Sequence, residues 1–486
     1  MQATAVPYPL DRRACERARL TRDARFDGLF FTAVTSTGIY CRPVCPAPAP
    51  KPSHVRYFAS AAAAAAAGFR PCLRCRPEAA PGSPLHRVRG ELVAGALRLI
   101  EQGALDHASM GDLARRIGVG ERHLRRIFAV EVGASPNEVA ATRRLLFAKQ
   151  LLAETALPIT TIASAAGYAS LRRFNAAFSA AYGKPPRAIR RGLAAPTANE
   201  LLLRLPYRQP YDFAGLRDFL GRRAIPRIEA VDANSYRRSF MADGKPGWFA
   251  VELLPGEAAL ALRIHHASTK SLGEIAARVR RMFDVDADPR AIAATLRCSV
   301  LLKPLLRRWA GQRLPGAWDG FELAVRAVLG QQVSVAAART LAARLVDRYG
   351  TPFAEGSAVG LDALFPGPEH LVEAPLEEIG VMRARATTIR NLAEACLDRR
   401  IGFGIEQSLP AFAERLCELS GIGSWTAQYI ALRALSHPDA FPAGDLVLRR
   451  VAGNGVALSA RALETASVAW RPWRAYAVML LWRAAA

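Results

Sequence analysis

The chain has 486 residues, enough for about three folding units of ordinary size. Lys and Arg number 66 against 42 Asp and Glu, which gives a net charge of +24, and only six of the basic residues are Lys. Guanidinium groups neutralise phosphates, so this excess favours a nucleic-acid partner, although a genome rich in Ala and Arg codons also produces Arg in place of Lys. No run approaches the ~18 apolar residues of a membrane span, and the first residues lack a signal-peptide pattern. We therefore expect a cytoplasmic, multidomain protein that binds no membrane.

Three stretches rich in Pro, Gly and Ala have the composition of joints: 77–84, 192–197 and, more loosely, 307–315. They divide the chain into four predicted domains, which are 1–84, 85–193, 198–305 and 306–486.

Four of the eight cysteines form two close pairs, Cys41-x3-Cys45 and Cys72-x2-Cys75, and the other four are scattered. This distribution argues against a disulfide framework and matches a tetrahedral thiolate site for one Zn²⁺. Between the pairs, seven alanines follow Ser60, which predicts a short capped helix that ends at Gly68.

The second part contains an internal repeat. Residues 113–119 recur at 162–168 with an offset of 49 residues, and each copy is followed by two apolar residues four positions apart. Each copy therefore predicts a helix, a turn with a glycine and a second helix. We expect two helix-turn-helix units.

The third part mixes an alternating stretch, 259–264, with a helical one, 272–282, and predicts a small α+β unit. The fourth part is almost entirely helical in pattern. It contains a helix-hairpin-helix pattern at 419–429, in which Gly421 and Gly423 let backbone N–H groups approach a DNA phosphate.

The two cysteine motifs, residues 37–45 and 68–77, resemble the N-terminal domain of the Ada alkylation-response regulator over roughly residues 10–80. The resemblance implies that Cys41 is both a zinc ligand and the nucleophile that irreversibly takes a methyl group from a DNA phosphotriester. Four thiolates around Zn²⁺ carry a formal charge of about −2, and methylation of one leaves −1. DNA affinity should then rise, which turns repair into a transcriptional switch.

The second repeat copy, with Phe174, Phe178, Gly183 and Arg190, resembles the AraC-type transcription regulators, and the likeness covers about residues 88–192. It implies that the second helix of each unit, about 120–130 and 170–181, enters the major groove. Each exposed side chain taken alone also fits an ordinary solvated helix face. The candidate DNA contacts are Arg122, His123, Arg126, Arg172, Arg173 and Asn175.

Residues 321–334, 419–429 and 441–445 together resemble AlkA-type DNA-3-methyladenine glycosylases, over about residues 199–485. The resemblance implies a TBP-like α+β domain followed by an all-α helix-hairpin-helix domain. It makes Asp445, otherwise an ordinary helix N-cap, the carboxylate that stabilises positive charge on deoxyribose and orients water. Gln332 takes the position of the wedge that fills the space left by a flipped base.

The same resemblance implies a base pocket lined by Trp425, Tyr429 and Trp482, whose aromatic faces attract an electron-poor alkylated purine. Related lyases carry a Lys in the hairpin where this chain has Trp425, so we expect a monofunctional glycosylase. We expect no iron-sulfur cluster, because Cys396 and Cys417 have no matching cysteines.

The sequence therefore predicts a mainly α repair enzyme and regulator that binds duplex DNA, alkylated DNA and a promoter, contacts RNA polymerase and is monomeric. No Pro-Cys-His-Arg sequence for an O6-alkylguanine transferase occurs. Two other readings remain open at this point. One is a transcription regulator whose weak glycosylase half only senses damage. The other is a glycosylase tethered by a structural zinc domain, favoured by Pro46–Pro50, where basic residues are often found.

Overall fold

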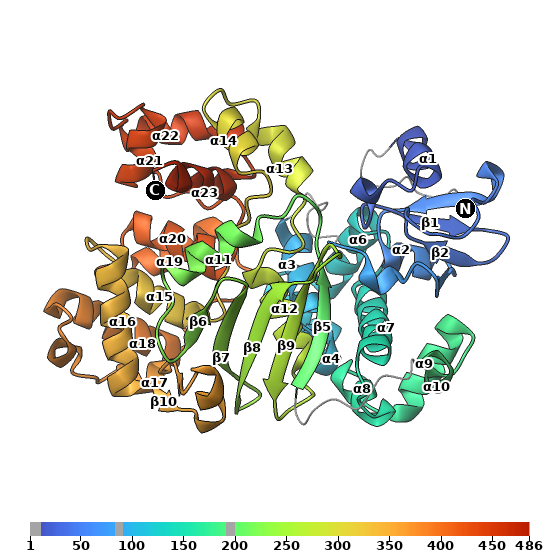
Figure 1. The fold of residues 1–486 in the computed structure, drawn as a ribbon, viewed down its shortest axis with the longest axis horizontal. Coiled ribbons are helices and arrows are strands. Elements are labelled where there is room, and N and C mark those ends of the chain that lie inside the picture. Colours follow the sequence, from blue (N-terminus) through green and yellow to red (C-terminus); the bar gives the residue numbers. More distant parts are fainter. Residues whose placement is uncertain (1–10, 83–90, 191–199, 486) are drawn as a thin grey trace. The chain divides into compact units, whose positions relative to one another are not determined.

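The computed structural model describes residues 11–82, 91–190 and 200–485 (Figure 1). The chain divides into two units, Met1–Arg208 with Gly256–Arg278 and Gln209–Pro255 with Val279–Ala486. In the described ranges, no helix is both long enough and apolar enough to cross a membrane.

The cysteine domain, residues 11–82, is built on a four-stranded sheet of order β3-β1-β2-β4. Strand β2 pairs antiparallel with β1 and parallel with β4, so Tyr40 lies opposite Pro71. Ser60 caps the polyalanine helix through a hydrogen bond from Ala63 N–H, as predicted. The elements are α1 (Arg12–Leu20), β1 (Phe31–Val34), β2 (Ile39–Cys41), β3 (Val55–Phe58), α2 (Ala61–Ala66) and β4 (Arg70–Pro71).

Both copies of the repeat form helix-turn-helix units, which confirms the prediction. The apolar pairs that follow the turns, Leu124 with Phe128 and Phe174 with Phe178, are completely buried. The helices are α3 (Glu91–Glu101), α4 (Ala104–His107), α5 (Met110–Ile117), α6 (Glu121–Glu131), α7 (Pro136–Glu154), α8 (Ile159–Ala165), α9 (Leu171–Tyr182) and α10 (Pro186–Ile189).

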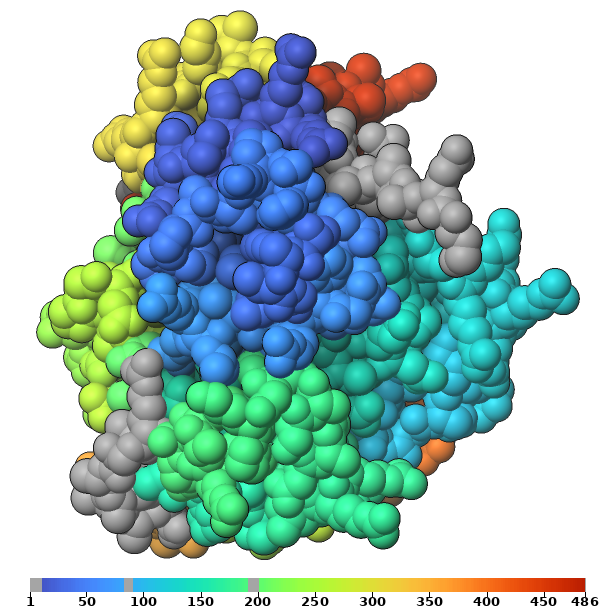
Figure 2. Space-filling view, turned by 90° about the vertical axis from the view of Figure 1, so that its right-hand side faces the viewer, coloured from blue at the N-terminus to red at the C-terminus, as the bar shows by residue number. Residues whose placement is uncertain are grey.

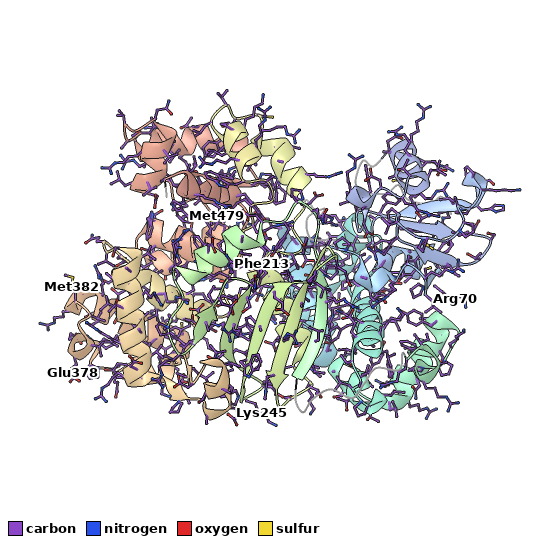
Figure 3. The ribbon with its side chains drawn as sticks, viewed as in Figure 1. Arg70, Phe213, Lys245, Glu378, Met382 and Met479 are labelled. Atoms are coloured by element: carbon purple, nitrogen blue, oxygen red, sulfur yellow. The ribbon has the colours of Figure 1, made fainter. Side chains whose placement is uncertain are left out.

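The cysteine domain packs against the double helix-turn-helix domain within the first unit, and Figure 2 shows their blue and green surfaces in contact. Lys149 of α7 forms a buried ion pair with Glu78, and Arg76 pairs with Glu154 at 3.3 Å. Arg70 of β4, labelled in Figure 3, lies beside Gly183 at the end of α9. These buried charges hold the four-cysteine site in a fixed position relative to the helix-turn-helix units.

Strand β5 (Glu200–Pro206) pairs antiparallel with β9 (Ala259–His266) in the first unit. Strand β9 contains the predicted alternating stretch, and the predicted helix is α12 (Leu272–Met282). In the second unit β6 (Glu229–Val231), β7 (Ser235–Ala242) and β8 (Lys245–Leu253) form an antiparallel meander. The antiparallel strands and their helices confirm the expected α+β character.

The rest of the second unit is almost entirely helical, as predicted, and its two short strands have two residues each. Phe213 of α11, labelled in Figure 3, stacks on Phe283 in its core. The elements are α11 (Phe213–Gly221), α13 (Pro289–Leu296), α14 (Leu302–Arg308), α15 (Gly320–Leu329), α16 (Val335–Tyr349), β10 (Thr351–Pro352), β11 (Ala363–Leu364), α17 (Pro368–Leu371), α18 (Arg383–Leu397), α19 (Leu409–Cys417), α20 (Ser424–Ala434), α21 (Leu446–Ala452), α22 (Ala460–Ser467) and α23 (Arg474–Ala484).

The third predicted joint, 307–315, is well packed. Arg313 is fully buried there and donates hydrogen bonds to the carbonyls of Asp284, Ala287 and Pro210. The joint at 77–84 lies partly outside the described residues, and the joint at 192–197 lies entirely outside them.

Candidate metal centre and active site

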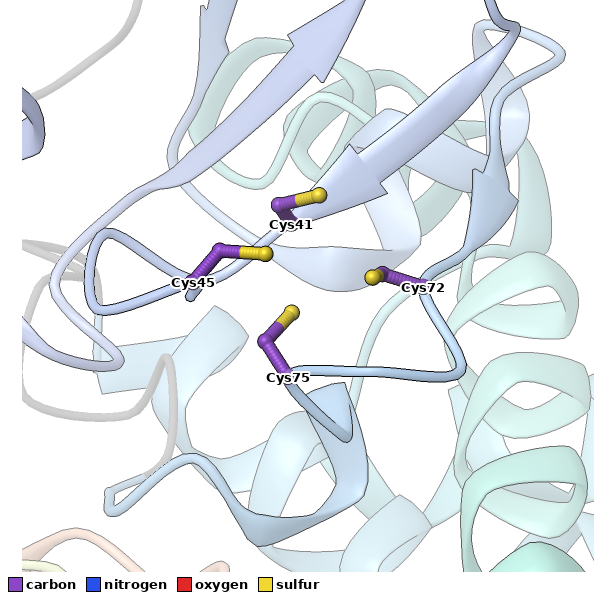
Figure 4. A group of neighbouring side chains, drawn as sticks. All are labelled: Cys41, Cys45, Cys72 and Cys75. Carbon is purple, nitrogen blue, oxygen red and sulfur yellow. The ribbon is translucent and has the colours of Figure 1, made fainter. Parts of the chain in front are cut away.

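The four clustered cysteines come together at one end of the small sheet, and their sulfurs all lie within 4.8 Å of one another (Figure 4). Cys41 ends β2 and Cys72 follows β4, and a hydrogen bond from Cys72 N–H to the Tyr40 carbonyl fixes the two strand ends together. Four thiolates at this spacing are the donor set of a closed tetrahedral zinc site. The predicted metal centre is therefore confirmed.

Crowding of the four thiols has a marked electrostatic effect. Hydrogen bonding from the Cys41 thiol lowers the pKa of Cys45 to about 7, and hydrogen bonds to Cys45 and then Cys72 raise the pKa of Cys41 itself. The sulfurs cannot all ionise together without a cation between them. A bound divalent metal supplies that charge.

A backbone N–H group distinguishes Cys75 from Cys41. Cys75 Sγ accepts a hydrogen bond from Arg42 N–H at 3.3 Å. Cys41 is half-buried, and the described residues provide no backbone donor to its sulfur. An N–H donor withdraws electron density from a thiolate, so Cys41 should be a stronger nucleophile than Cys75.

Arg42 connects this centre to the chain around it. Its guanidinium donates to Asp27 Oδ1 at 2.9 Å and to the Cys75 carbonyl at 3.0 Å. Asp27 is buried, and its own carbonyl accepts from buried Arg208, at the end of the first unit. This set could not be predicted from the sequence, because no local pattern links position 27 to position 208.

The predicted DNA-contacting residues of the helix-turn-helix units lie on α6 and α9. All six side chains are exposed, and Arg126 Nη2 lies 3.3 Å from His123 Nδ1. The buried residues of the same helices face inward. The fold thus presents each second helix as an open, mainly basic surface.

In the second unit, the predicted hairpin forms between α19 and α20. Gly421 has φ of +89°, and a Cβ there would lie 2.0 Å from Thr388 Oγ1, so this position requires glycine. Gly423 is extended, and a Cβ there would meet nothing within 4 Å, which leaves the backbone open on its outer side. Of the two predicted glycines, only Gly421 is required by the protein's own conformation.

Asp445 is the N-cap of α21, as its local sequence predicted, and its Oδ1 accepts from Leu448 N–H at 2.9 Å. Two further donors orient the carboxylate. Trp425 Nε1 lies 2.9 Å from Oδ2, and Trp482 Nε1 lies 3.3 Å from Oδ1. The structure therefore brings together the predicted acid and two of the three predicted pocket residues, through contacts that the sequence did not indicate.

The aromatic pocket residues form a continuous surface beside Asp445. The Trp425 and Tyr429 rings are parallel with centroids 5.5 Å apart, and Tyr429 is 6.1 Å from Trp482. Arg433 Nη1 donates to the Tyr429 hydroxyl at 3.2 Å. Burial raises the pKa of Tyr429, but the guanidiniums of Arg433 and Arg223 outweigh it and leave that pKa below its usual value. The i, i+4 spacing of Tyr429 and Arg433 could have indicated this contact.

The predicted wedge, Gln332, is exposed at the turn after α15 and has φ of +55°. Its neighbour Gln331, which is not among the predicted site residues, donates through Nε2 to the Gly421 carbonyl at 2.9 Å. The wedge turn and the hairpin are therefore neighbours in the second unit.

Comparison with known proteins adds four family matches along the chain. They are the metal binding domain of Ada at residues 14–78, a helix-turn-helix domain at 113–192, the AlkA N-terminal domain at 202–319 and the HhH-GPD superfamily of base excision DNA repair proteins at 325–475. These matches agree with the two sites and with zinc as the metal of the cysteine centre.

A Mycobacterium tuberculosis protein described as a probable bifunctional transcriptional activator/DNA repair enzyme AlkA is 40% identical over 479 residues, covering 97% of this chain and 96% of that protein. The chain belongs to this bifunctional AlkA family. DNA binding through its helix-turn-helix and HhH-GPD domains follows from that membership.

Other relatives match the two halves of the chain separately. DNA-3-methyladenine glycosylase 2 of Escherichia coli is 32% identical over 57% of this chain and 95% of its own length. The Escherichia coli bifunctional transcriptional activator/DNA repair enzyme Ada is 36% identical over 30% of this chain and 40% of its own. The solved 3-methyladenine DNA-glycosylase of Archaeoglobus fulgidus shares the fold of 58% of the chain, with a TM-score of 0.51 and 22% identity.

Proposed function

We propose that this chain excises 3-methyladenine and related alkylated bases at Asp445, accepts methyl groups from DNA phosphotriesters at Cys41, and activates transcription in response. The observation that carries the proposal is the orientation of the Asp445 carboxylate. Three N–H donors fix it, and two of these belong to the aromatic surface that would hold the base.

Asp445 would act on a base flipped out of the duplex into this pocket. As the bond between the base and C1′ breaks, its electron pair leaves with the base, and the carboxylate stabilises the positive charge on the sugar. Water then bonds to C1′ and gives its proton to Asp445, which returns it to solvent. A base alkylated at N3 or N7 is cationic before departure and leaves as a neutral molecule, so it needs little further assistance.

Base release from alkylated duplex DNA tests this assignment. We expect wild type to free 3-methyladenine and Asp445→Asn to lose the activity while it still binds DNA. Asp288→Asn is the matched control, because Asp288 also caps a helix of the second unit, through Arg290 N–H and Ala291 N–H. A wild-type protein that binds alkylated DNA and releases no base would favour a damage-sensing regulator instead.

Cys41 would be the methyl acceptor. Zn²⁺ held by the four cysteines keeps the sulfurs deprotonated. Cys41 Sγ attacks the methyl carbon of the phosphotriester, the S–C bond forms, and the C–O electron pair remains on the phosphate. Cys41 is more exposed than the buried Cys72 and Cys75, and it lacks the backbone N–H donor that Cys75 has, which supports this choice over those two.

Peptide mass spectrometry after incubation with methylphosphotriester DNA locates the methyl group. We expect a gain of one methyl group on the Cys41 peptide. Cys298 is an exposed free thiol in the second unit and serves as an internal control that stays unmodified. Methylation at another zinc ligand would contradict the choice of Cys41, and methylation at none would leave the zinc domain with a structural role.

The helix-turn-helix surfaces of α6 and α9 would bind a promoter and recruit RNA polymerase to it. Because the substrate is chromosomal DNA, the protein would act in the cytoplasm. Methylation removes one negative charge near the DNA, so promoter affinity should rise. Equal promoter affinity of methylated and unmethylated protein would contradict the switch.

A further inference from the structure

The side-chain amide of Gln331 bridges two segments that face DNA in the proposed function. Its Nε2 donates to the Gly421 carbonyl in the hairpin at 2.9 Å and lies 3.1 Å from Thr426 Oγ1 in the first turn of α20. Gln331 follows Gly330, the C-cap of α15, and precedes the exposed wedge candidate Gln332. One half-buried side chain thus connects the wedge turn with the phosphate-binding hairpin.

The hairpin carbonyls are held from the protein side by side chains. Thr388 Oγ1 lies 3.0 Å from the Ser420 carbonyl oxygen and 3.0 Å from the Ala384 carbonyl oxygen, so its single proton is shared between them. Gln331 donates to the next carbonyl of the hairpin, that of Gly421. The carbonyls of Ser420 and Gly421 are therefore both engaged by side chains of the protein. On the other side of the hairpin, a Cβ at Gly423 would meet nothing within 4 Å. This arrangement leaves the open side of the hairpin for a phosphate.

The wedge turn needs an external restraint. Gln332 has φ of +55°, a left-handed conformation that costs a residue with a side chain roughly 1 kcal/mol and persists where the surroundings determine it. The described contacts of Gln331 to the hairpin and to α20 provide such surroundings one residue away. Without them the turn could relax, and the wedge side chain would lose its direction.

We propose that Gln331 is a positioning residue that couples insertion of Gln332 into the duplex to docking of the hairpin on a phosphate. The proposal rests on the glycosylase function proposed above, which requires a flipped base. An amide suits the role because its two donor hydrogens can reach a carbonyl and a hydroxyl at once. Binding of the hairpin to the backbone then fixes where the wedge enters.

The test measures base flipping without base release, in an Asp445→Asn background. Fluorescence of 2-aminopurine at the target position reports flipping, because it rises when the base leaves the stack. Two ordinary hydrogen bonds together change an equilibrium by about tenfold, so we expect Gln331→Ala to lower the flipping equilibrium by that factor. We expect Gln332→Ala to lower it too, and the double variant to match Gln332→Ala alone, because Gln331 acts through Gln332.

The control variant is Gln407→Ala. Gln407 also donates through Nε2 to two carbonyls, those of Gly402 and Gly404, in a loop outside the wedge and hairpin. We expect this variant to flip the base as its parent does. Gln331→Glu keeps the side-chain shape but lacks both donors, and we expect it to flip as poorly as Gln331→Ala with an unchanged melting temperature.

Three results would overturn the proposal: unchanged flipping in Gln331→Ala, effects of Gln331→Ala and Gln332→Ala that multiply in the double variant, or full flipping in Gln331→Glu. A parent protein with no flipping signal contradicts both this proposal and the glycosylase function. If the Asp445→Asn parent flips the base but wild type releases none, only the glycosylase function is contradicted.

Discussion

Removing one N–H donor from Asp445 should slow base release by an amount that follows the hydrogen-bond geometry. Trp425→Phe and Trp482→Phe each keep an aromatic ring beside Tyr429 and delete only the indole donor. The Trp425 bond is 2.9 Å long and the Trp482 bond is 3.3 Å long. A hydrogen bond to a charged group contributes about 1.5–3 kcal/mol. The Trp482 bond is the longer of the two, so it should contribute about 1.5 kcal/mol or less.

Because each 1.36 kcal/mol is a factor of ten in rate, we expect Trp425→Phe to slow release roughly 10- to 150-fold and Trp482→Phe about tenfold or less. The assay is single-turnover release of 3-methyladenine with enzyme in excess, which isolates the chemical step from binding. DNA affinity, measured by fluorescence anisotropy with Asp445→Asn versions of both variants, should change little.

The reverse order of effects would refute this reasoning. So would wild-type rates in both variants, because the two indoles would then only stack on the base. A loss confined to DNA affinity would likewise mean that the donors do not act on the carboxylate during the reaction.

Three other changes test the fold around the two sites. Lys149→Met should destabilise the first unit by about 1.5–3 kcal/mol in chemical denaturation, because buried Glu78 loses the charged hydrogen bond from Lys149 and keeps only Arg76 as its cation, and a smaller loss in the double variant with Glu78→Leu would confirm that cause. Burial raises the pKa of Asp284 from 3.8 to about 6, so the stability it contributes is complete below about pH 4 and is lost as the pH rises through 6. Over that window the free energy of unfolding of wild type should fall by about 3 kcal/mol relative to that of Asp284→Asn. Parallel pH profiles of the two proteins would contradict this. Gly421→Ala should weaken binding to undamaged DNA, because its Cβ collides with Thr388 and its φ is positive, whereas Gly423→Ala should retain the hairpin conformation in the free protein.

Much of the architecture could be predicted because its signals are local. The cysteine spacing indicates the zinc centre, the repeat indicates both helix-turn-helix units, and Asp445 before a helical run indicates its N-cap. These features depend on neighbours within a few residues or on repeated patterns, and both can be read directly from a chain.

The rest depends on contacts between distant segments. The bonds from Trp425 and Trp482 to one carboxylate join positions up to 37 residues apart, and their directions are set by how three helices pack. Strand β4 has only two residues, too few for a periodic signal, although it fixes Cys72 beside Cys41. The buried Arg313 in the third predicted joint was likewise invisible, because its partners are backbone carbonyls, which any sequence supplies.

The central claim is that one chain carries two separate repair chemistries, and a single alkylated DNA preparation can test it. Released bases and methylated Cys41 peptide would be measured together for wild type, Asp445→Asn and Cys41→Ala. We expect wild type to give both products, Asp445→Asn only the methylated peptide, and Cys41→Ala only the released base. Loss of both products in either variant, or of neither, would contradict the account.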